Sequence, residues 1–271
     1  MNAPQFESIL IVFQNPRPGC VEPYDDWYTN IHIRDAMRLD GALATQRFIA
    51  HDQQLVCDGV AVRPEHWAHT IYEWESAAKS VLGHGARAGT PAMEISGDGS
   101  FEGLRDYFYR PDYLSHGWSL EAGFRRGDAV LTAMIVPHAG TEAAVRDWFR
   151  DIHAPPTLAL PGFGSAALFS LHEEQSLPTP CRFTMVAIYG LADVGAALGA
   201  WARRSAGGEE PDLAARFAEA EITCWEKRID RLLARDVANP KPDAAAAEER
   251  ARTAFAGSYM TQDALARALG G

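Results

Sequence analysis

Residues 8–48 read SILIVFQNPRPGCVEPYDDWYTNIHIRDAMRLDGALATQRF, and residues 129–169 read AVLTAMIVPHAGTEAAVRDWFRDIHAPPTLALPGFGSAALF. The two stretches align without a gap at a constant offset of 121, with 10 identities in 41 positions. This is roughly four times the chance level for average composition. The identical pairs are Leu10/Leu131, Pro16/Pro137, Gly19/Gly140, Asp26/Asp147, Trp27/Trp148, Ile31/Ile152, His32/His153, Leu39/Leu160, Gly41/Gly162 and Phe48/Phe169. Because the rare Trp and His fall in the shared D-W-[YF]-x-x-I-H block, we interpret the chain as a tandem duplication.

Each copy has the pattern of one small α+β unit. In the first copy, apolar and β-branched runs predict strands over residues 8–13, 42–50, 67–74 and 101–109. Helical spacing of apolar residues predicts helices over residues 23–39, capped by Gly41, and over residues 76–82. In the second copy, strands are predicted over residues 130–136, 163–171, 181–189 and 222–227, and helices over residues 141–153, 193–203 and 211–220. The prolines at 155 and 156 predict that the helix carrying His153 ends or kinks there.

The element order in each copy is β-α-β-β-α-β, which predicts an α+β fold of two ferredoxin-like repeats. The boundaries follow: a first repeat over residues 1–110, a linker over 111–127, a second repeat over 128–233, and a C-terminal helical arm over 234–271. A sheet covered by helices on one face has a bare apolar face that must be buried. We therefore expect the two antiparallel sheets to face each other as an intrachain dimeric α/β barrel, with the ligand pocket between them.

The second copy carries the block D-W-[YF]-x-x-x-H-x-P followed by L-P-G-F, from Asp147 to Phe163. This resembles the EthD-like branch of the dimeric α/β barrel superfamily. The first copy departs from the pattern, with Arg34 in place of the proline and Asp40-Gly41-Ala42 in place of Pro-Gly-Phe. The resemblance implies the fold for both repeats. For activity it implies a range that includes cofactor-free oxygenases, cyclases, isomerases, decarboxylases, dehydratases and haem proteins.

The composition narrows the class of protein. The formal net charge of -11 disfavours a nucleic-acid-binding surface, which needs clustered Lys and Arg. The apolar runs are strand-length, so no membrane span is predicted, and the N-terminus lacks the pattern of a signal peptide. The cysteines at 20, 57, 181 and 224 show no C-x-x-C spacing, as in reduced cytoplasmic proteins. We therefore expect a cytoplasmic protein without a metal site, a monomer or homodimer whose partner is a small-molecule substrate.

The first-copy helix carries the strongest candidates for chemistry. Helical spacing places Tyr28 one turn before His32 and Asp35 about one turn after it. Such a stripe can orient an imidazole for general acid/base work, so we predict His32, Tyr28 and Asp35 as catalytic residues. The alternative is that His32 is a structural residue of the helix.

Further residues are predicted to bind substrate. Arg47, on the next strand, could hold a carboxylate or an oxyanion. On the third strand, alternation separates His69 from Tyr72, and we name both as candidates because the pattern leaves the pocket face open. Trp27 is also a candidate, although its residue type favours a core anchor, and His153 stands in surroundings poorer in polar groups than those of His32. We expect the first copy to hold the working site and the second to serve as scaffold.

The leading hypothesis is an enzyme without cofactor that transfers protons on a small apolar, aromatic or polyketide-like molecule. Dehydration, decarboxylation and isomerisation all fit this hypothesis, with His32 as acid or base. The alternatives are a haem protein with His32 or His153 as axial ligand, and a non-catalytic small-molecule binding protein.

Overall fold

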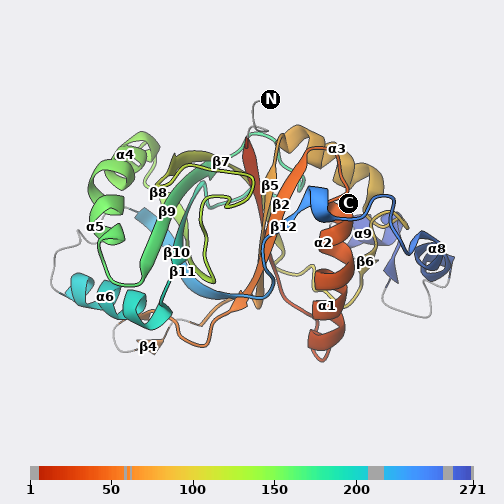
Figure 1. Cartoon of the computed structure of the whole chain (residues 1–271), viewed down its shortest axis with the longest axis horizontal. Helices are drawn as coiled ribbons and strands as arrows, with labels where there is room; N and C mark the ends of the chain where they lie inside the picture. The colour runs from red at the N-terminus through yellow and green to blue at the C-terminus, as the bar shows by residue number, and fades with distance from the viewer. Residues whose placement is uncertain (1–5, 58–59, 62, 207–216, 253–258, 270–271) are drawn as a thin grey trace.

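The computed structural model describes residues 6–57, 60–61, 63–206, 217–252 and 259–269. Within them, eight long antiparallel strands form one sheet in the order β10-β9-β7-β1-β5-β2-β11-β8. They are β1 (Ser8–Gln14), β2 (Ala42–Ala50), β5 (Ala68–Trp74), β7 (Arg105–Leu114), β8 (Ala129–Pro137), β9 (Phe163–Leu171), β10 (Met185–Leu191) and β11 (Phe217–Lys227). The end strands β8 and β10 lie side by side, so the sheet closes into a barrel (Figure 1). The predicted α+β class and closed antiparallel barrel are confirmed.

The strand order follows the two parts of the chain. The first four long strands are neighbours in the order β7-β1-β5-β2, and the ladders β7–β9 and β2–β11 join them to the later four. The earlier helices cover one side of the barrel and the later helices the opposite side (Figure 1). The earlier set is α1 (Val21–Trp27), α2 (Ile33–Ala36) and α3 (Ala77–Arg87), and the later set is α4 (Glu142–Trp148), α5 (Ala154–Leu158) and α6 (Val194–Ala206).

A π-helical turn interrupts each helix that carries the D-W block. η1 (Tyr28–His32) joins α1 to α2, and η2 (Phe149–His153) joins α4 to α5. The helix is divided at the predicted place, because η2 ends at His153 and α5 begins at Ala154, with Pro155 and Pro156 in its first turn. Proline is tolerated there, since those N–H groups have no partner within the helix anyway.

The strand and helix limits differ from the predictions in places. β11 begins at Phe217, so the helix predicted over residues 211–220 is wrong for its last four residues, and residues 211–216 lie outside the described residues. Long-range pairing of β11 with β8 sets this limit, and helical periodicity cannot report such pairing. Among the described residues, none of the helices is long and apolar enough to cross a membrane.

The interior of the barrel is a packed core. Apolar side chains from both parts of the chain fill it, including Ile9, Phe13, Ile71, Phe169 and Trp225. The expectation of a ligand pocket between the two sheets is therefore wrong. The inward-facing residues include the rings of Phe13, Phe169 and Trp225, and the space beside Phe13 and Trp225 is only about 20 Å³.

A buried ion cluster closes one end of the barrel. Both Glu73 carboxylate oxygens accept hydrogen bonds from Arg231, each at 2.6 Å, and Arg126 lies 3.1 Å away. Trp118 Nε1 also donates to Glu73, and its ring stacks on Phe6 at a centroid distance of 5.5 Å. Burial opposes the charge of Glu73, but the two guanidinium groups keep its pKa below the ordinary value.

We expect Glu73→Ala to lower the free energy of unfolding by about 3–5 kcal/mol, because Arg126 and Arg231 would lose their buried carboxylate. Urea denaturation measures this loss. The control is Glu75→Ala, which removes an exposed carboxylate paired with Lys79 and should cost less than about 1 kcal/mol. Equal losses in the two variants would contradict a stabilising role for the cluster.

The C-terminal segment lies against the helices of the first part. It contains α8 (Ala244–Arg252), β13 (Tyr259–Met260) and α9 (Gln262–Ala268), and β13 pairs with β6 (Ile95–Ser96). Figure 1 shows α9 on the same side of the barrel as α1, α2 and α3. This segment therefore adds a layer next to the site described below.

Candidate functional site

A cavity of about 590 Å³ lies between the outer face of β1, β5 and β7 and the helices that cover it. Small-molecule sites commonly have volumes of roughly 300–1,000 Å³ and mostly apolar walls. The apolar walls come from Leu10, Val12, Trp27, Val81, Met93, Ile95, Phe101, Leu104, Leu177, Leu265 and Leu269. The polar groups come from Gln14, Tyr28, His32, Tyr72, His84, Asp106, Ser176, Gln262 and Asp263. The cavity therefore has the size, the apolar walls and the sparse polar groups of a small-molecule site.

Four of the eight sequence-predicted residues line this cavity: Trp27, Tyr28, His32 and Tyr72. The first three come from the junction of α1 and η1, where the backbone N–H of Ile33 bonds to the carbonyl of Tyr28 in a wide π turn. The wide turn brings the rings of Tyr28 and His32 to a centroid distance of 4.9 Å. π turns within α-helices are frequent at functional sites.

His32 is a neutral group at pH 7. Burial lowers its pKa to about 3, and the nearby His84 acts in the same direction. A hydrogen bond to the backbone carbonyl of Glu94 opposes this shift without overcoming it. Its Nδ1 atom is buried and has no hydrogen-bond partner among the described residues. The imidazole is thus a weak base that lies in the cavity wall.

The Tyr28 and Tyr72 hydroxyl groups form a pair, with their oxygens 3.2 Å apart. Burial raises the pKa of both phenols, so both stay protonated. The Arg47 guanidinium lies over the Tyr28 ring at 4.6 Å from its centroid, and its charge partly offsets the effect of burial. The pair can therefore donate a hydrogen bond to a ligand oxygen.

Asp106 is a cavity residue that the sequence analysis missed. It lies on β7 opposite Val12 of β1, and Ser176 Oγ donates a hydrogen bond to its Oδ1 at 3.1 Å. Burial raises the pKa of its carboxyl group to about 6. The sequence does contain a signal for this residue, because alternation places the Asp106 carboxylate on the same strand face as Phe108, which is fully buried. A carboxyl group with a pKa near neutrality in a cavity is a candidate general base.

His84 is a second histidine in the cavity wall, contributed by α3. Its Nδ1 lies 2.9 Å from the carbonyl oxygen of Ser80, and burial lowers its pKa. Its ring lies edge-on to Trp74 at a centroid distance of 5.6 Å. The sequence analysis did not select His84, because the Gly-rich run around it offered no recognisable motif.

Two predicted site residues, Asp35 and Arg47, form ion pairs away from the cavity. Asp35 pairs with Arg38 and with Lys241 Nζ at 2.8 Å, and does not contact His32. Arg47 is fully buried, where it pairs with Asp25 and donates to Thr29 Oγ1 at 2.8 Å. Neither side chain lines the cavity, so the roles of imidazole partner and carboxylate binder do not fit where they lie. Arg38 lies only three residues after Asp35, but Lys241 and Asp25 come from other segments of the chain, and helical spacing cannot report these.

The two remaining candidates are packed away from the cavity. His69 points into the barrel, where its ring stacks on Phe13 at 4.4 Å, because the opposite face of β5 carries Tyr72. His153 is 2% exposed, and its Nε2 lies 2.8 Å from the hydroxyl of Tyr189. Both are surrounded by protein, so neither can reach a ligand in the cavity.

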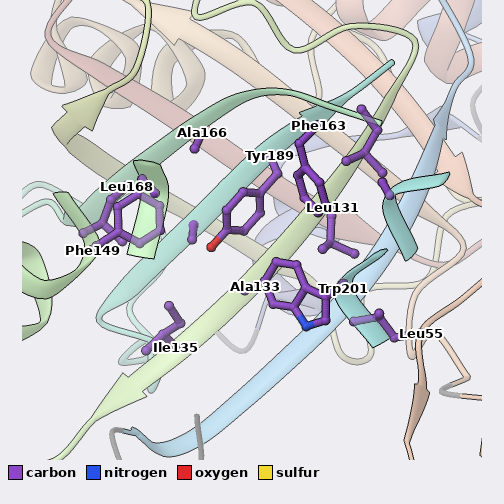
Figure 2. Close-up of a cluster of buried hydrophobic side chains, with 14 of the residues drawn as sticks. Leu55, Leu131, Ala133, Ile135, Phe149, Phe163, Ala166, Leu168, Tyr189 and Trp201 are labelled. Atoms are coloured by element: carbon purple, nitrogen blue, oxygen red, sulfur yellow. The ribbon is translucent and has the colours of Figure 1, made fainter. Parts of the chain in front are cut away.

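The later part of the chain has a filled core where the earlier part has the cavity. The rings of Phe149, Phe163, Tyr189 and Trp201 meet over the outer face of β8, β9 and β10 (Figure 2). Trp201 lies 5.5 Å from Tyr189 and 5.8 Å from His153, between ring centroids. The polar groups of the cavity therefore lie under the earlier helices, and the later helices cover a packed core.

The described residues do not provide an evident metal or haem site. No group of three or more His, Cys, Asp or Glu side chains among them could hold a metal ion. Among the described residues that line the cavity, none is a lysine or arginine that could pair with haem propionates. The two carboxylates in the wall, Asp106 and Asp263, would repel them. The cavity thus favours a neutral ligand over haem.

Comparisons with known proteins show likeness in structure alone. Neither a family model nor a curated protein sequence matches the chain. A crystal structure of an "anthrone oxidase-like protein" matches over 87% of this chain and 96% of that one, with a TM-score of 0.53 and 16% identity. A "Putative monooxygenase" from Fusobacterium nucleatum matches over 84% of this chain and 94% of that one, with a TM-score of 0.49 and 10% identity. This chain has the fold of the dimeric α/β barrel proteins.

Proposed function

We propose that the protein is an enzyme that transfers protons, without an organic cofactor, on a small neutral molecule of aromatic or polyketide-like character. The observation that carries this proposal is the raised pKa of Asp106, about 6, in an apolar cavity shared with the Tyr28–Tyr72 hydroxyl pair. A base whose pKa is close to the working pH transfers protons most effectively. Dehydration and isomerisation of such molecules remain within this proposal. Decarboxylation does not, because its substrate carries a carboxylate, which Asp106 and Asp263 in the cavity wall would repel.

The roles follow from charge and hydrogen bonding. The Asp106 carboxylate takes a proton from a carbon next to a ligand carbonyl, and the electron pair of the C–H bond moves onto the carbonyl oxygen. A Tyr28 or Tyr72 hydroxyl donates a hydrogen bond to that enolate oxygen. The protonated Asp106 then returns its proton to carbon in an isomerisation, or to a departing hydroxyl group in a dehydration. His32 acts as a neutral hydrogen-bond partner of the ligand instead of the principal base.

The two parts of the chain support a duplication in which one site was kept. Position 28 corresponds to Phe149 by the 121-residue offset. His84 stands seven residues after the first residue of α3, and Trp201 stands seven residues after the first residue of α6, so the two positions correspond. Asp106 pairs with Val12, and Ile222 pairs with Ala133, which is the counterpart of Val12. Three polar positions of the cavity are thus apolar in the later part, as expected for two ferredoxin-like, EthD-like repeats that diverged.

The loss of one hydroxyl explains the difference between the two histidines. In the earlier part, the Tyr72 hydroxyl pairs with that of Tyr28. In the later part, Phe149 has no hydroxyl, and the Tyr189 hydroxyl bonds to His153 instead. His32 is thereby left facing the cavity, whereas His153 is part of a packed core.

Anthrone is a suitable probe, because it is a neutral aromatic ketone with an acidic methylene group and is named in the description of one structural neighbour. We expect the wild-type protein to accelerate exchange of the anthrone methylene protons with D₂O, measured by ¹H NMR under argon. Only the ionised form of Asp106, whose pKa is about 6, removes the proton. The rate should therefore fall about tenfold per pH unit below this pKa and level off above about pH 7.

Buffer alone and heat-denatured protein are the controls. Saturable anthrone binding without exchange at any pH would favour the non-catalytic binding protein. Exchange that is independent of pH between 4 and 8 would contradict the assignment of Asp106 as base. A Soret band that titrates to one equivalent of added haem would favour the haem alternative.

A further inference from the structure

The outer wall of the cavity is formed by the C-terminal helix α9, which lies far along the chain from the strands behind it. Leu265, Ala266 and Leu269 contribute the apolar part of this wall. The other walls come from the sheet and from α1, η1 and α3. A ligand in the cavity would therefore touch both the body of the protein and its C-terminal end.

The residues of α9 are held less firmly than those of the helices opposite. None of them is fully buried, whereas α1 buries Tyr24 and Asp25, and α3 buries Ala77 and Ser80. The two-residue strand β13 precedes α9 and pairs with β6 alone. Elements with little buried apolar surface open locally at low free-energy cost.

The chain that leads to α9 is anchored beside the cavity. Lys241 Nζ contacts Asp35 Oδ2 at 2.8 Å and Glu94 Oε1 at 2.7 Å. All three side chains are at least nine-tenths buried. This cluster fixes the start of the C-terminal segment to the loop before β6, while α9 itself rests on α3.

Gly89 marks the closest approach between α9 and the end of α3. A Cβ atom at this position would lie 2.7 Å from the backbone nitrogen of Gln262 and 2.9 Å from the carbonyl carbon of Thr261. Both distances are too short for any side chain, so α9 can reach its position only because residue 89 is glycine. Its φ of +77° also favours glycine.

We propose that α9 is the gate of the cavity and the wall that selects its ligand. A ligand enters when α9 swings away from α3 about the anchored segment, and Leu265 and Leu269 contact it after α9 returns. This proposal rests on the proposed function only in taking the cavity as the ligand site, and it requires no turnover.

A single methyl group tests the gate. Gly89→Ala should push the first turn of α9 outward and accelerate both association and dissociation of the neutral naphthalene fluorophore prodan by about tenfold, measured by stopped-flow fluorescence. Gly140→Ala is the matched control, because Gly140 has the same φ of +77° and nothing within 4 Å of its Cβ position. It carries the same backbone strain, and its prodan kinetics should match those of the wild type within about twofold.

The wall is tested by a second pair of variants. Leu265→Ala should weaken prodan affinity by about tenfold through loss of buried apolar contact. Leu82→Ala is the control, because this side chain is 74% exposed and does not line the cavity. Both variants are made in the full-length chain, and circular dichroism checks their folding.

The outcomes separate this proposal from the proposed function. Unchanged prodan kinetics in Gly89→Ala, or equal affinity loss in Leu265→Ala and Leu82→Ala, would overturn the gate and the wall, whatever the anthrone result. If the wild type excludes prodan, admission by Gly89→Ala alone supports the gate, and exclusion by both proteins overturns it. Faster kinetics without anthrone exchange would leave the gate standing and reject the catalytic proposal.

Discussion

Asp106→Asn is expected to lower the rate of anthrone proton exchange by about 10²–10⁴-fold, the usual contribution of a general base. The amide keeps the shape of the side chain and can still accept a hydrogen bond from Ser176, but it cannot take up a proton. The dissociation constant for anthrone should change less than about threefold, because the cavity walls are unchanged. Proton exchange is followed by ¹H NMR, and binding is followed by equilibrium dialysis.

The stability of the Asp106→Asn variant tests the raised pKa of Asp106 independently of activity. Burial raises the folded-state pKa of Asp106 to about 6 from an ordinary value of 3.8. Protonated Asp106 therefore favours the folded state below pH 3.8, and this contribution is lost as the pH rises through about 6. At pH 8 the wild type carries a partly buried charge that the asparagine variant lacks. We expect the variant to be at least as stable as the wild type at pH 8.

The control for Asp106 lies on the same strand. Asp112 of β7 also accepts a hydrogen bond from a serine, Ser170, and burial raises its pKa as well. It does not line the cavity, so Asp112→Asn should leave anthrone exchange unchanged. Equal rate losses in the two variants, or a lower Tm for Asp106→Asn at pH 8, would contradict the assignment.

The two histidines of the repeated block should respond in opposite ways to alanine substitution. His153→Ala is expected to lower the free energy of unfolding by about 2–4 kcal/mol, because it opens a cavity and removes the contact between the His153 imidazole and the buried Tyr189 hydroxyl. His32→Ala should change this free energy by less than about 1 kcal/mol, because its imidazole already faces a cavity.

Activity should show the reverse order. His32→Ala is expected to slow anthrone exchange by about 10²-fold, through loss of a ligand hydrogen bond in an apolar site. His153→Ala should leave the exchange rate of the folded protein unchanged. Urea denaturation and proton exchange are measured on both variants. If His153→Ala abolishes exchange and His32→Ala does not, the site belongs to the other half of the chain.

The local elements could be predicted from the sequence because their signals are local. Alternation and helical spacing report which residues are apolar on one face, and this placed the strands β1, β2, β5 and β9 within a few residues of their limits. The offset of 121 predicted that the two stretches take the same form, and both contain an α-helix interrupted by a π turn that ends at a histidine.

The candidate site could be predicted only where one element carried it. Trp27, Tyr28 and His32 share one helical stretch, and all three line the cavity. Asp35 and Arg47 lie away from the cavity, where they pair with Lys241 and Asp25 from other segments. Asp106 was missed because its pKa depends on burial, which a strand acquires only when helices and loops cover it.

By itself, the sequence determined the α+β class and two stretches of matching pattern, each with a histidine in its first helix. Only the tertiary structure decided which sheet face is open to a ligand. Closing the barrel buries large aromatic side chains inside it, so the ligand space lies outside, under the first-half helices and α9. The alternation of β5 alone does not distinguish the two faces, because it places His69 on one face and Tyr72 on the other. Side-chain volume and long-range strand pairing decide which face is packed and which is open. The same packing leaves Asp106 in an apolar wall and gives it a pKa that its sequence neighbours do not encode.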